Sequence, residues 1–248
     1  MKYLEEHKIG FNTGVAKVPI VPSAILYDLN IGRADVRPDP AMGYLAASQA
    51  SSAPPVEGNI GAGTGASVGK MFGASLAMKS GLGTASMDIG GGIIVGALVA
   101  VNAWGDVIDP QTNQIIAGLR SGKVGPLRVG KKEYFADTLA MLKSPLGRGV
   151  LNLTSHTNTV IGVIATNASL TKAQATKVAQ MAQDGFARTL RPAHTMLDGD
   201  VIFALSTGTK KADVSIIGAF AAEVMAEAIL RAVKMAKPAG GLPGLNKA

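Results

Sequence analysis

Apolar and polar residues form their most regular pattern in the last third of the chain. Thr159–Thr166 is a compact β-branched and apolar run of strand length. The helix that we expect next begins at Thr171, which has Gln174 at the capping-box spacing and apolar residues at helical intervals after it. Val201–Ser206 predicts another apolar strand, and Asp213–Met235 predicts a long, alanine-rich, mostly buried helix. Strand and helix therefore alternate in this region.

The earlier part of the chain is less regular. Val18–Asn30 is rich in β-branched and apolar residues, but Pro19 and Pro22 within it predict an irregular or edge strand. Asp106–Ser155 is the most polar long stretch, and we expect it to be an exposed excursion. Further predicted elements are short helices at Lys2–Lys8, Tyr44–Ala50 and Tyr134–Lys143 and buried strands at Lys79–Met87 and Gly92–Ala103. This alternation favours an α/β fold with helices layered around sheet.

The composition limits the classes to which the protein can belong. With 248 residues, of which 47% are apolar, the chain can bury a continuous core. It has no Cys, which excludes disulfides, thiol nucleophiles and thiolate metal sites. The net charge of +7 comes from 24 Lys and Arg against 17 Asp and Glu. These basic residues are spread along the chain without an aromatic platform or a DNA-binding motif, so a solvated basic surface is the simpler interpretation.

From the sequence we expect neither a membrane span nor an export signal. Its start, Met1–His7, is acidic where a secretory signal would be basic and then apolar. The longest apolar run, Ile89–Ala103, is interrupted by glycines and is shorter than the roughly 20 residues that span a bilayer. We therefore expect a soluble, cytoplasmic protein with no membrane partner and no nucleic-acid partner.

The densest glycine cluster, Gly58–Ala66, resembles phosphate-binding loops without satisfying their patterns. Gly69-Lys70 is followed by Met71, where a Walker loop needs Ser or Thr. A dinucleotide-binding fingerprint would follow a strand, and none is predicted before the cluster. A nucleotide site is therefore a distant alternative, and we interpret the cluster as a turn that lets backbones approach closely.

The histidines do not predict a metal site. The chain has three, His7, His156 and His194, which are far apart in sequence. No pair of them has the helix-face spacing with a carboxylate that zinc sites use. No Gly-x-Ser-x-Gly elbow is present for a Ser-His-Asp triad either. We expect no metal ion and no organic cofactor.

A different kind of nucleophile is suggested by Asn158-Thr159, where a polar loop meets the predicted strand. A threonine hydroxyl is a weak nucleophile, but a Thr at a chain N-terminus has its own α-amino group, of pKa about 7.7–8.0, as a base. Exposing that group requires a cut before Thr159, which the same hydroxyl can make by attacking the preceding carbonyl. From the residues alone, an ordinary Thr at the start of a strand is the simpler interpretation.

Several sequence blocks, in order along the chain, favour the interpretation of Thr159 as a nucleophile. Together they resemble the DmpA/β-peptidyl aminopeptidase family of self-processing N-terminal-nucleophile hydrolases, and they extend over most of the chain to about Ser206. The matching blocks are Val56–Gly65, Gly81–Ser86, Val99–Gly105, Thr159–Leu170, Ala187-Arg188 and Asp198–Ala204. The resemblance implies a layered αββα-type sandwich of the DmpA and ornithine acetyltransferase kind.

The resemblance also implies roles for individual residues. Thr159 lies at the position of the family's nucleophile, freed by cleavage after Asn158. Asn102 lies where the family places a side-chain amide in the oxyanion hole, and such a donor acts where charge develops on the substrate carbonyl. Tyr27 corresponds to a Tyr that helps that oxyanion hole.

Two acidic residues complete the implied site. Asp198 and Asp200 align with a Ser-Gly-acidic motif that orients the nucleophile and binds its amino group. Asp200 keeps the acidic member, whereas Asp198 replaces the hydroxyl residue, which suggests a subgroup with altered pKa tuning or substrate preference. Without the resemblance, an ordinary Asp-Gly turn would explain both residues.

A second departure from the family concerns the start of the chain. Family members carry a further N-terminal portion before the helix to which Met1–Glu6 corresponds. Three explanations are open: the start is assigned late, the sequence is a fragment, or a shortened version folds. Missing strands would leave apolar edges exposed and make the protein unstable or dependent on a partner.

The resulting hypothesis is a single hydrolase domain, 1–248, cut into a large part, 1–158, and a small part, 159–248, with a flexible tail at 237–248. It would release N-terminal residues from short peptides or from amino-acid amides and esters, and it would form a homo-oligomer. Two alternatives remain open. One is an acyltransferase of the ornithine acetyltransferase type, and the other is an N-terminally truncated, non-catalytic relative.

Overall fold

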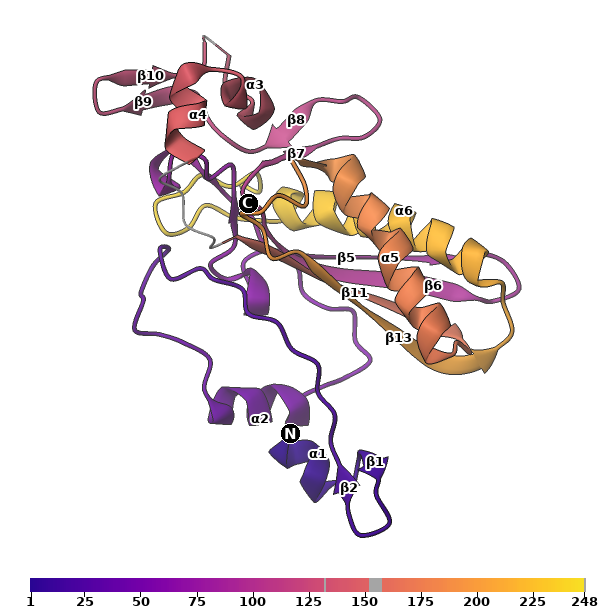
Figure 1. Cartoon of the computed structure of the whole chain (residues 1–248). Coiled ribbons are helices and arrows are strands. Elements are labelled where there is room, and N and C mark those ends of the chain that lie inside the picture. The colour runs from indigo at the N-terminus through magenta and orange to yellow at the C-terminus, as the bar shows by residue number, and fades with distance from the viewer. Residues whose placement is uncertain (132, 152–157, 248) are drawn as a thin grey trace. The chain divides into compact units, whose positions relative to one another are not determined.

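The computed structural model describes residues 1–131, 133–151 and 158–247 (Figure 1). These residues form two compact units, Met1–Ile25 with Arg33–Pro55 and Leu26–Gly32 with Val56–Ala248. Within the described ranges, no helix is both long enough and apolar enough to cross a bilayer.

The first unit is built from short elements. It contains α1 (Lys2–Glu6), β1 (Phe11–Asn12), β2 (Lys17–Val18) and α2 (Pro40–Ser48). The hydroxyl of Tyr44, on α2, donates to Glu6 Oε2 at 2.7 Å, and its ring lies edge-on to Tyr3. Asp39 caps α2 by accepting from Met42 N at 2.8 Å. The helices predicted at the two ends of this unit are therefore present.

The prediction of an irregular strand over Val18–Asn30 is wrong, because the strand in the structure is much shorter. Only its first residue is paired, in the two-residue strand β2, and residues 19–30 have no strand structure. Pro19 and Pro22 lack the backbone N–H that a ladder needs, so the apolar residues around them cannot form an extended pairing.

The second unit contains a four-stranded sheet in the order β13-β11-β6-β5. The central strand β11 is parallel to β13 and antiparallel to β6, which is itself antiparallel to β5. The strands are β5 (Leu82–Asp88), β6 (Ile94–Asn102), β11 (Thr159–Ala168) and β13 (Val201–Lys210), so the four apolar runs predicted as strands are confirmed.

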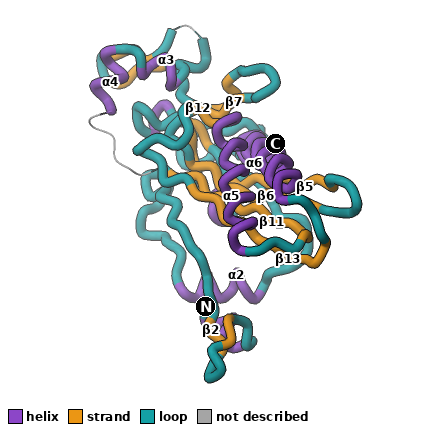
Figure 2. Tube along the Cα trace, turned by 45° about the vertical axis from the view of Figure 1, so that its right-hand side comes forward, coloured by secondary structure: helices purple, strands orange, loops and turns teal. Residues whose placement is uncertain are grey.

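Two long helices cover one face of this sheet, as Figures 1 and 2 show. They are α5 (Lys172–Thr189) and α6 (Val214–Lys234). The predicted capping box at the start of α5 is present, with Thr171 and Gln174 each accepting from the other's backbone N–H. Asp213 caps α6 by accepting from Ser215 N and Ile216 N. Both predicted helices are therefore confirmed.

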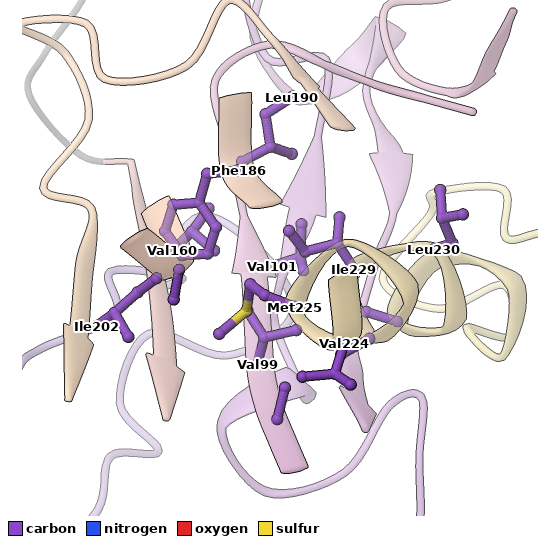
Figure 3. Packing of buried hydrophobic residues seen from close by; sticks show 14 of the residues in the cluster. Val99, Val101, Val160, Phe186, Leu190, Ile202, Val224, Met225, Ile229 and Leu230 are labelled. Atoms are coloured by element: carbon purple, nitrogen blue, oxygen red, sulfur yellow. The ribbon is translucent and has the colours of Figure 1, made fainter. Parts of the chain in front are cut away.

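The core lies between these helices and the sheet. Figure 3 shows Val99 and Val160 from the sheet packed beside Phe186 of α5 and Met225 of α6, and all four are buried. Side chains along β11 alternate between buried and half-exposed. This period-2 pattern places Val160 on the helix-covered face and Thr159 on the opposite face.

Glycines allow the backbones in this unit to approach closely. A Cβ at Gly83 of β5 would lie 2.0 Å from Ala228 O of α6, so only Gly allows the helix to lie so near the strand. In the glycine cluster, a Cβ at Gly58 would lie 2.4 Å from Met235 O, and one at Gly63 would lie 2.3 Å from Leu82 N. The interpretation of the cluster as a close-approach turn is confirmed.

The polar excursion contains more structure than the sequence predicts. It forms α3 (Thr138–Leu142), α4 (Pro145–Leu151) and the short strands β7 (Asp106–Ile108), β8 (Ile115–Ala117), β9 (Gly122–Val124) and β10 (Leu127–Val129). The remaining elements of the unit are η1 (Gly61–Gly63), β3 (Ser67–Val68), η2 (Ala74–Leu76), β4 (Met78–Lys79) and β12 (Leu190–Arg191). Strands of two or three residues are too short to give a periodic signal.

A buried carboxylate ties this excursion to the end of the sheet. Asp106 accepts from Leu119 N at 2.7 Å, from Thr138 N at 2.7 Å and from Thr138 Oγ1 at 2.8 Å. Burial raises the pKa of Asp106 to about 6. A second apolar cluster fills the space beside it, made of Met71, Leu76, Trp104, Leu119, Val129 and Ala136.

The segment expected to be a flexible tail makes several contacts with the second unit. Pro243 O accepts from Lys79 N at 2.8 Å, and Ala236 O accepts from Asn246 N at 3.0 Å. Leu242 is buried.

Gly83→Ala should destabilise the protein by about 1–3 kcal/mol, because the added methyl group forces α6 away from β5. The matched control is Gly96→Ala on β6, where a Cβ would meet its nearest atom at an ordinary 3.7 Å. Urea unfolding of the two variants measures the difference. Equal midpoints for both variants would contradict the close-approach interpretation.

Candidate active site

The register of β11 against β6 places two predicted site residues side by side. Thr159 is paired with Asn102 across the antiparallel ladder. Residues directly opposite in such a ladder have their side chains on the same face. Both side chains therefore lie on the face of the sheet that α5 and α6 do not cover.

The turn before β13 lies against the predicted cleavage point. Asn158 forms a parallel bridge with Asp198, and Asn158 O accepts from Gly199 N at 2.8 Å. The same carbonyl oxygen accepts from Thr159 Oγ1 at 2.5 Å. A Cβ at Gly199 would lie 3.2 Å from Thr159 Oγ1, so Gly is the residue that lets this backbone approach the hydroxyl without crowding it.

Asp200 supports the first residues of β11 from the neighbouring strand. Its Oδ1 accepts from Val160 N at 2.9 Å, and its Oδ2 lies 3.5 Å from His194 Nδ1. The side chain is only 4% exposed. Burial, followed by the nearby charge of Asp198, raises the pKa of Asp200 above its usual range.

Asp198 is fixed by a different set of contacts. Its Oδ1 accepts from Trp104 N at 3.1 Å, and its Oδ2 accepts from Thr195 Oγ1 at 2.6 Å. Trp104 lies two residues after Asn102, so this carboxylate joins the turn before β13 to the end of β6.

The amide of Asn102 is held by three neighbours. Its Nδ2 donates to Tyr27 O at 2.9 Å, and its Oδ1 accepts from Ser67 N at 3.2 Å and from Lys70 Nζ at 2.8 Å. An amide NH₂ group carries two N–H donors, and Tyr27 O accepts one of them. The side chain is buried, with 1% of the residue exposed.

Lys70 is the residue that sequence reasoning missed. Its ammonium donates to Asn102 O at 2.9 Å as well as to the side-chain oxygen. Burial lowers the pKa of Lys70 to about 7, although the charges of Asp198 and Asp28 oppose the shift. In the sequence Lys70 stands out only as the Lys after Gly69, and no spacing relates it to Asn102 or Asp198.

A cavity of about 380 Å³ opens beside this group of residues. Its lining combines polar residues with an apolar wall. The described lining residues are Tyr27, Asp28, Asn30, Ile31, Ser67, Lys70, Met71, Phe72, Gly73, Ala74, Asn102, Trp104, Val124, Val150 and Asn158. Pockets of about 300–1,000 Å³ with few convergent polar groups are typical small-ligand sites.

The structure thus brings Asn158, Thr159, Asn102, Asp198 and Asp200 into one region, and their roles remain predictions. Tyr27 joins them through its backbone carbonyl and through the cavity lining.

The three histidines do not form a group. His194 lies beside Asp200, His7 belongs to the first unit, and His156 lies outside the described residues. In the described part of the chain, no three His, Asp or Glu side chains are placed to hold a metal ion.

Comparison with known proteins shows the family of this chain. The model of peptidase family S58 matches residues 1–246. An uncharacterised aminopeptidase of Mycobacterium bovis is 40% identical over 258 aligned positions, which cover 98% of this chain and 71% of that protein. The resemblance derived from the sequence blocks is therefore confirmed.

Solved structures confirm the fold class. A β-aminopeptidase of a Burkholderia species superposes with a TM-score of 0.53 at 25% identity, over 83% of this chain and 55% of that one. The L-aminopeptidase D-Ala-esterase/amidase of Ochrobactrum anthropi, described as a variant of the Ntn hydrolase fold, gives 0.52 at 21% identity, over 82% and 51%. This chain spans about half the length of both.

Lys70→Met should flatten the dependence of stability on pH between pH 7 and 8. The pKa of Lys70 in the folded protein, about 7, is below its ordinary value of 10.5. Between these values the unfolded state binds more protons, so stability rises with pH, by about 1 kcal/mol over this interval. Lys79, with a pKa of about 8, adds its contribution mainly at higher pH.

Denaturant unfolding at pH 7.0, 7.5 and 8.0 measures this change. Lys177→Met, at an exposed position on α5, is the control and should keep the wild-type slope. Parallel curves for wild type and Lys70→Met would show that Lys70 is not buried as described.

Proposed function

This chain belongs to peptidase family S58, and from that premise we propose that it is a self-processing aminopeptidase. Thr159 is the nucleophile in this proposal, freed by cleavage of its own peptide bond with Asn158. The substrates are short peptides or amino-acid amides and esters with a free N-terminus. The observation that carries the proposal is the contact of the Thr159 hydroxyl with the Asn158 carbonyl, whose oxygen also accepts from Gly199 N.

Self-cleavage would begin with attack of Thr159 Oγ1 on the carbonyl carbon of Asn158. A C–O bond forms, the C–N bond to Thr159 breaks, and the nitrogen keeps the electron pair and takes up the hydroxyl proton. Water then hydrolyses the ester, which leaves the Asn158 carboxylate and a free Thr159 amine. The N–H of Gly199 supports this step because it already binds the oxygen on which negative charge develops.

The free amine then serves as the base for the next reaction. It takes the proton of the Thr159 hydroxyl while the oxygen attacks the substrate carbonyl. It then gives this proton to the leaving nitrogen as the scissile C–N bond breaks, which forms the acyl-enzyme and releases the amine product. Water hydrolyses the acyl-enzyme and regenerates Thr159. Asn102 supplies its second amide N–H to the oxyanion, since its position directly opposite Thr159 brings that donor to the same face.

The acidic residues would hold the new N-terminus. Asp200 already accepts from the N–H of Val160, one residue after the nucleophile. An ammonium at Thr159 would provide the buried Asp200 carboxyl with an opposite charge, which favours its ionised form. Asp198 would not contact the new N-terminus itself. It would position Asn102 indirectly, because it accepts from the backbone N–H of Trp104, two residues after Asn102.

Thr159→Ala should remain a single chain, because the attacking oxygen is absent. Thr159→Ser keeps a hydroxyl and should yield two fragments, residues 1–158 and 159–248. Intact mass under denaturing conditions and N-terminal sequencing of the smaller fragment measure both outcomes.

Thr166→Ala, on the same strand, is the matched control for this cleavage and should be cut like the wild type. A wild-type chain that stays intact for days at neutral pH would overturn the proposal. It would favour the non-catalytic relative instead.

Asn102→Asp should lower kcat by about 10²–10³-fold and change KM little, because it replaces an oxyanion donor with an acceptor of the same shape. The carboxylate can still accept from Lys70 and Ser67 N, but it cannot donate to Tyr27 O, so the thermal unfolding of the variant is measured alongside its kinetics. Steady-state hydrolysis of an amino-acid p-nitroanilide gives both constants. An unchanged kcat would remove Asn102 from the proposed oxyanion hole.

A further inference from the structure

Apolar side chains form part of the lining of the cavity beside Asn102 and Asn158, and we call this set the apolar wall. Three segments that are distant in sequence contribute to it, namely the loop at 26–32, the turn around Phe72 and the excursion that contains Val124 and Val150. The wall consists of Ile31, Met71, Phe72, Ala74, Val124 and Val150. A side chain placed against this wall would exchange water for apolar contacts.

This wall is supported from behind by the second core cluster. Met71 belongs to that buried cluster, and Phe72 and Val124 pack against it while they remain half-exposed toward the cavity. Val129, on the strand paired with that of Val124, is also part of the cluster. The wall is therefore the exposed edge of a packed core, which gives it a defined shape.

The charged lining residues lie with the polar group. Among the described lining residues, Asp28 and Lys70 are the ones that carry charge. Lys70 is bound to Asn102, and Asp28 interacts electrostatically with Lys70. A charged side chain against Phe72, Val124 and Val150 would lose hydration without gaining a partner, which is unfavourable.

We propose that this wall is the subsite for the side chain of the substrate's N-terminal residue, and that it selects aliphatic side chains over small and charged ones. The inference rests on the proposed function, since it uses Asn102 and Thr159 to fix where the scissile carbonyl lies. Phe72 and Val124 are the specificity-determining residues. A leucine side chain buried there should bind about 10- to 100-fold better than none.

The hairpin of β9 and β10 provides a matched pair of variants. Val124 lines the cavity, whereas its cross-strand partner Leu127 is 49% exposed and is not among the lining residues. Val124→Asp places a carboxylate in the wall, and Leu127→Asp places the same charge on the same hairpin at an exposed position that does not line the cavity. Phe72→Ala removes wall area from a different segment.

The test measures binding of L-leucinamide, glycinamide and L-lysinamide by calorimetry in a Thr159→Ala background, which cannot turn the ligands over. Because this variant stays uncut, it is measured both as the single chain and as co-expressed fragments 1–158 and 159–248. L-Leucinamide should bind about 10- to 100-fold more tightly than glycinamide. Val124→Asp should remove this preference and favour L-lysinamide, Phe72→Ala should reduce it, and Leu127→Asp should leave it unchanged.

The outcomes separate this inference from the function on which it rests. Equal affinities for the three amides, or no binding, would overturn the subsite. A preference for L-leucinamide that survives both Val124→Asp and Phe72→Ala would overturn it too. Selective binding together with a wild-type enzyme that does not hydrolyse L-leucinamide would support the subsite and contradict the aminopeptidase. Hydrolysis of glycyl and leucyl amides with equal kcat/KM would support the aminopeptidase and contradict the subsite.

Discussion

The position of β11 between an antiparallel and a parallel neighbour is the constraint on which the site depends. Its first residue is held opposite Asn102 of β6, and the residue before it is bridged to Asp198 ahead of β13. A slip of one residue would turn the Thr159 side chain toward α5 and α6 and would bury it in the core. Because one face of the sheet is packed with apolar side chains, that slip is strongly disfavoured, and the register of the core fixes the position of the hydroxyl.

Glycines that let two segments approach closely are a second recurring feature of the structure. At Gly83 a helix lies against a strand, and at Gly199 a turn lies against the hydroxyl of Thr159. Each contact leaves no room for an ordinary Cβ without displacement of its neighbour. At Gly83 the missing side chain allows close packing. At Gly199 it allows the backbone N–H to reach the carbonyl oxygen of Asn158.

Buried charges connect segments of the second unit that are distant in sequence. The ammonium of Lys79 donates to Gly63 O, Ala66 O and Ser80 O at 2.6–3.1 Å, and burial lowers its pKa to about 8. Lys70 holds Asn102 in a similar way. Such groups are costly to desolvate, and their hydrogen bonds to carbonyl oxygens offset part of that cost. Lys79 thereby joins the chain around Gly63, Ala66 and Ser80, and Lys70 joins its own loop to the end of β6.

The sequence by itself determined the elements with strong periodicity and explicit start signals. Thr159–Thr166, the capping box at Thr171 and the long helix after Asp213 could be predicted because side-chain pattern and local hydrogen bonding are properties of neighbouring residues. The family blocks likewise singled out Thr159 and Asn102 as candidate site residues, and their roles remain predictions. The short strands of the excursion escaped prediction, since a three-residue strand is stabilised by its partner and not by its own pattern.

Only the tertiary structure decided how the site is assembled. It showed that Lys70 binds Asn102, that Tyr27 meets that amide through its backbone carbonyl, and that Gly199 lies against the hydroxyl of Thr159. It also joined Val124 to Phe72 in one cavity wall. These relations join residues tens of positions apart in the chain. The physical reason is that burial, pKa shifts and cavity shape arise from packing between segments, which no single stretch of sequence encodes.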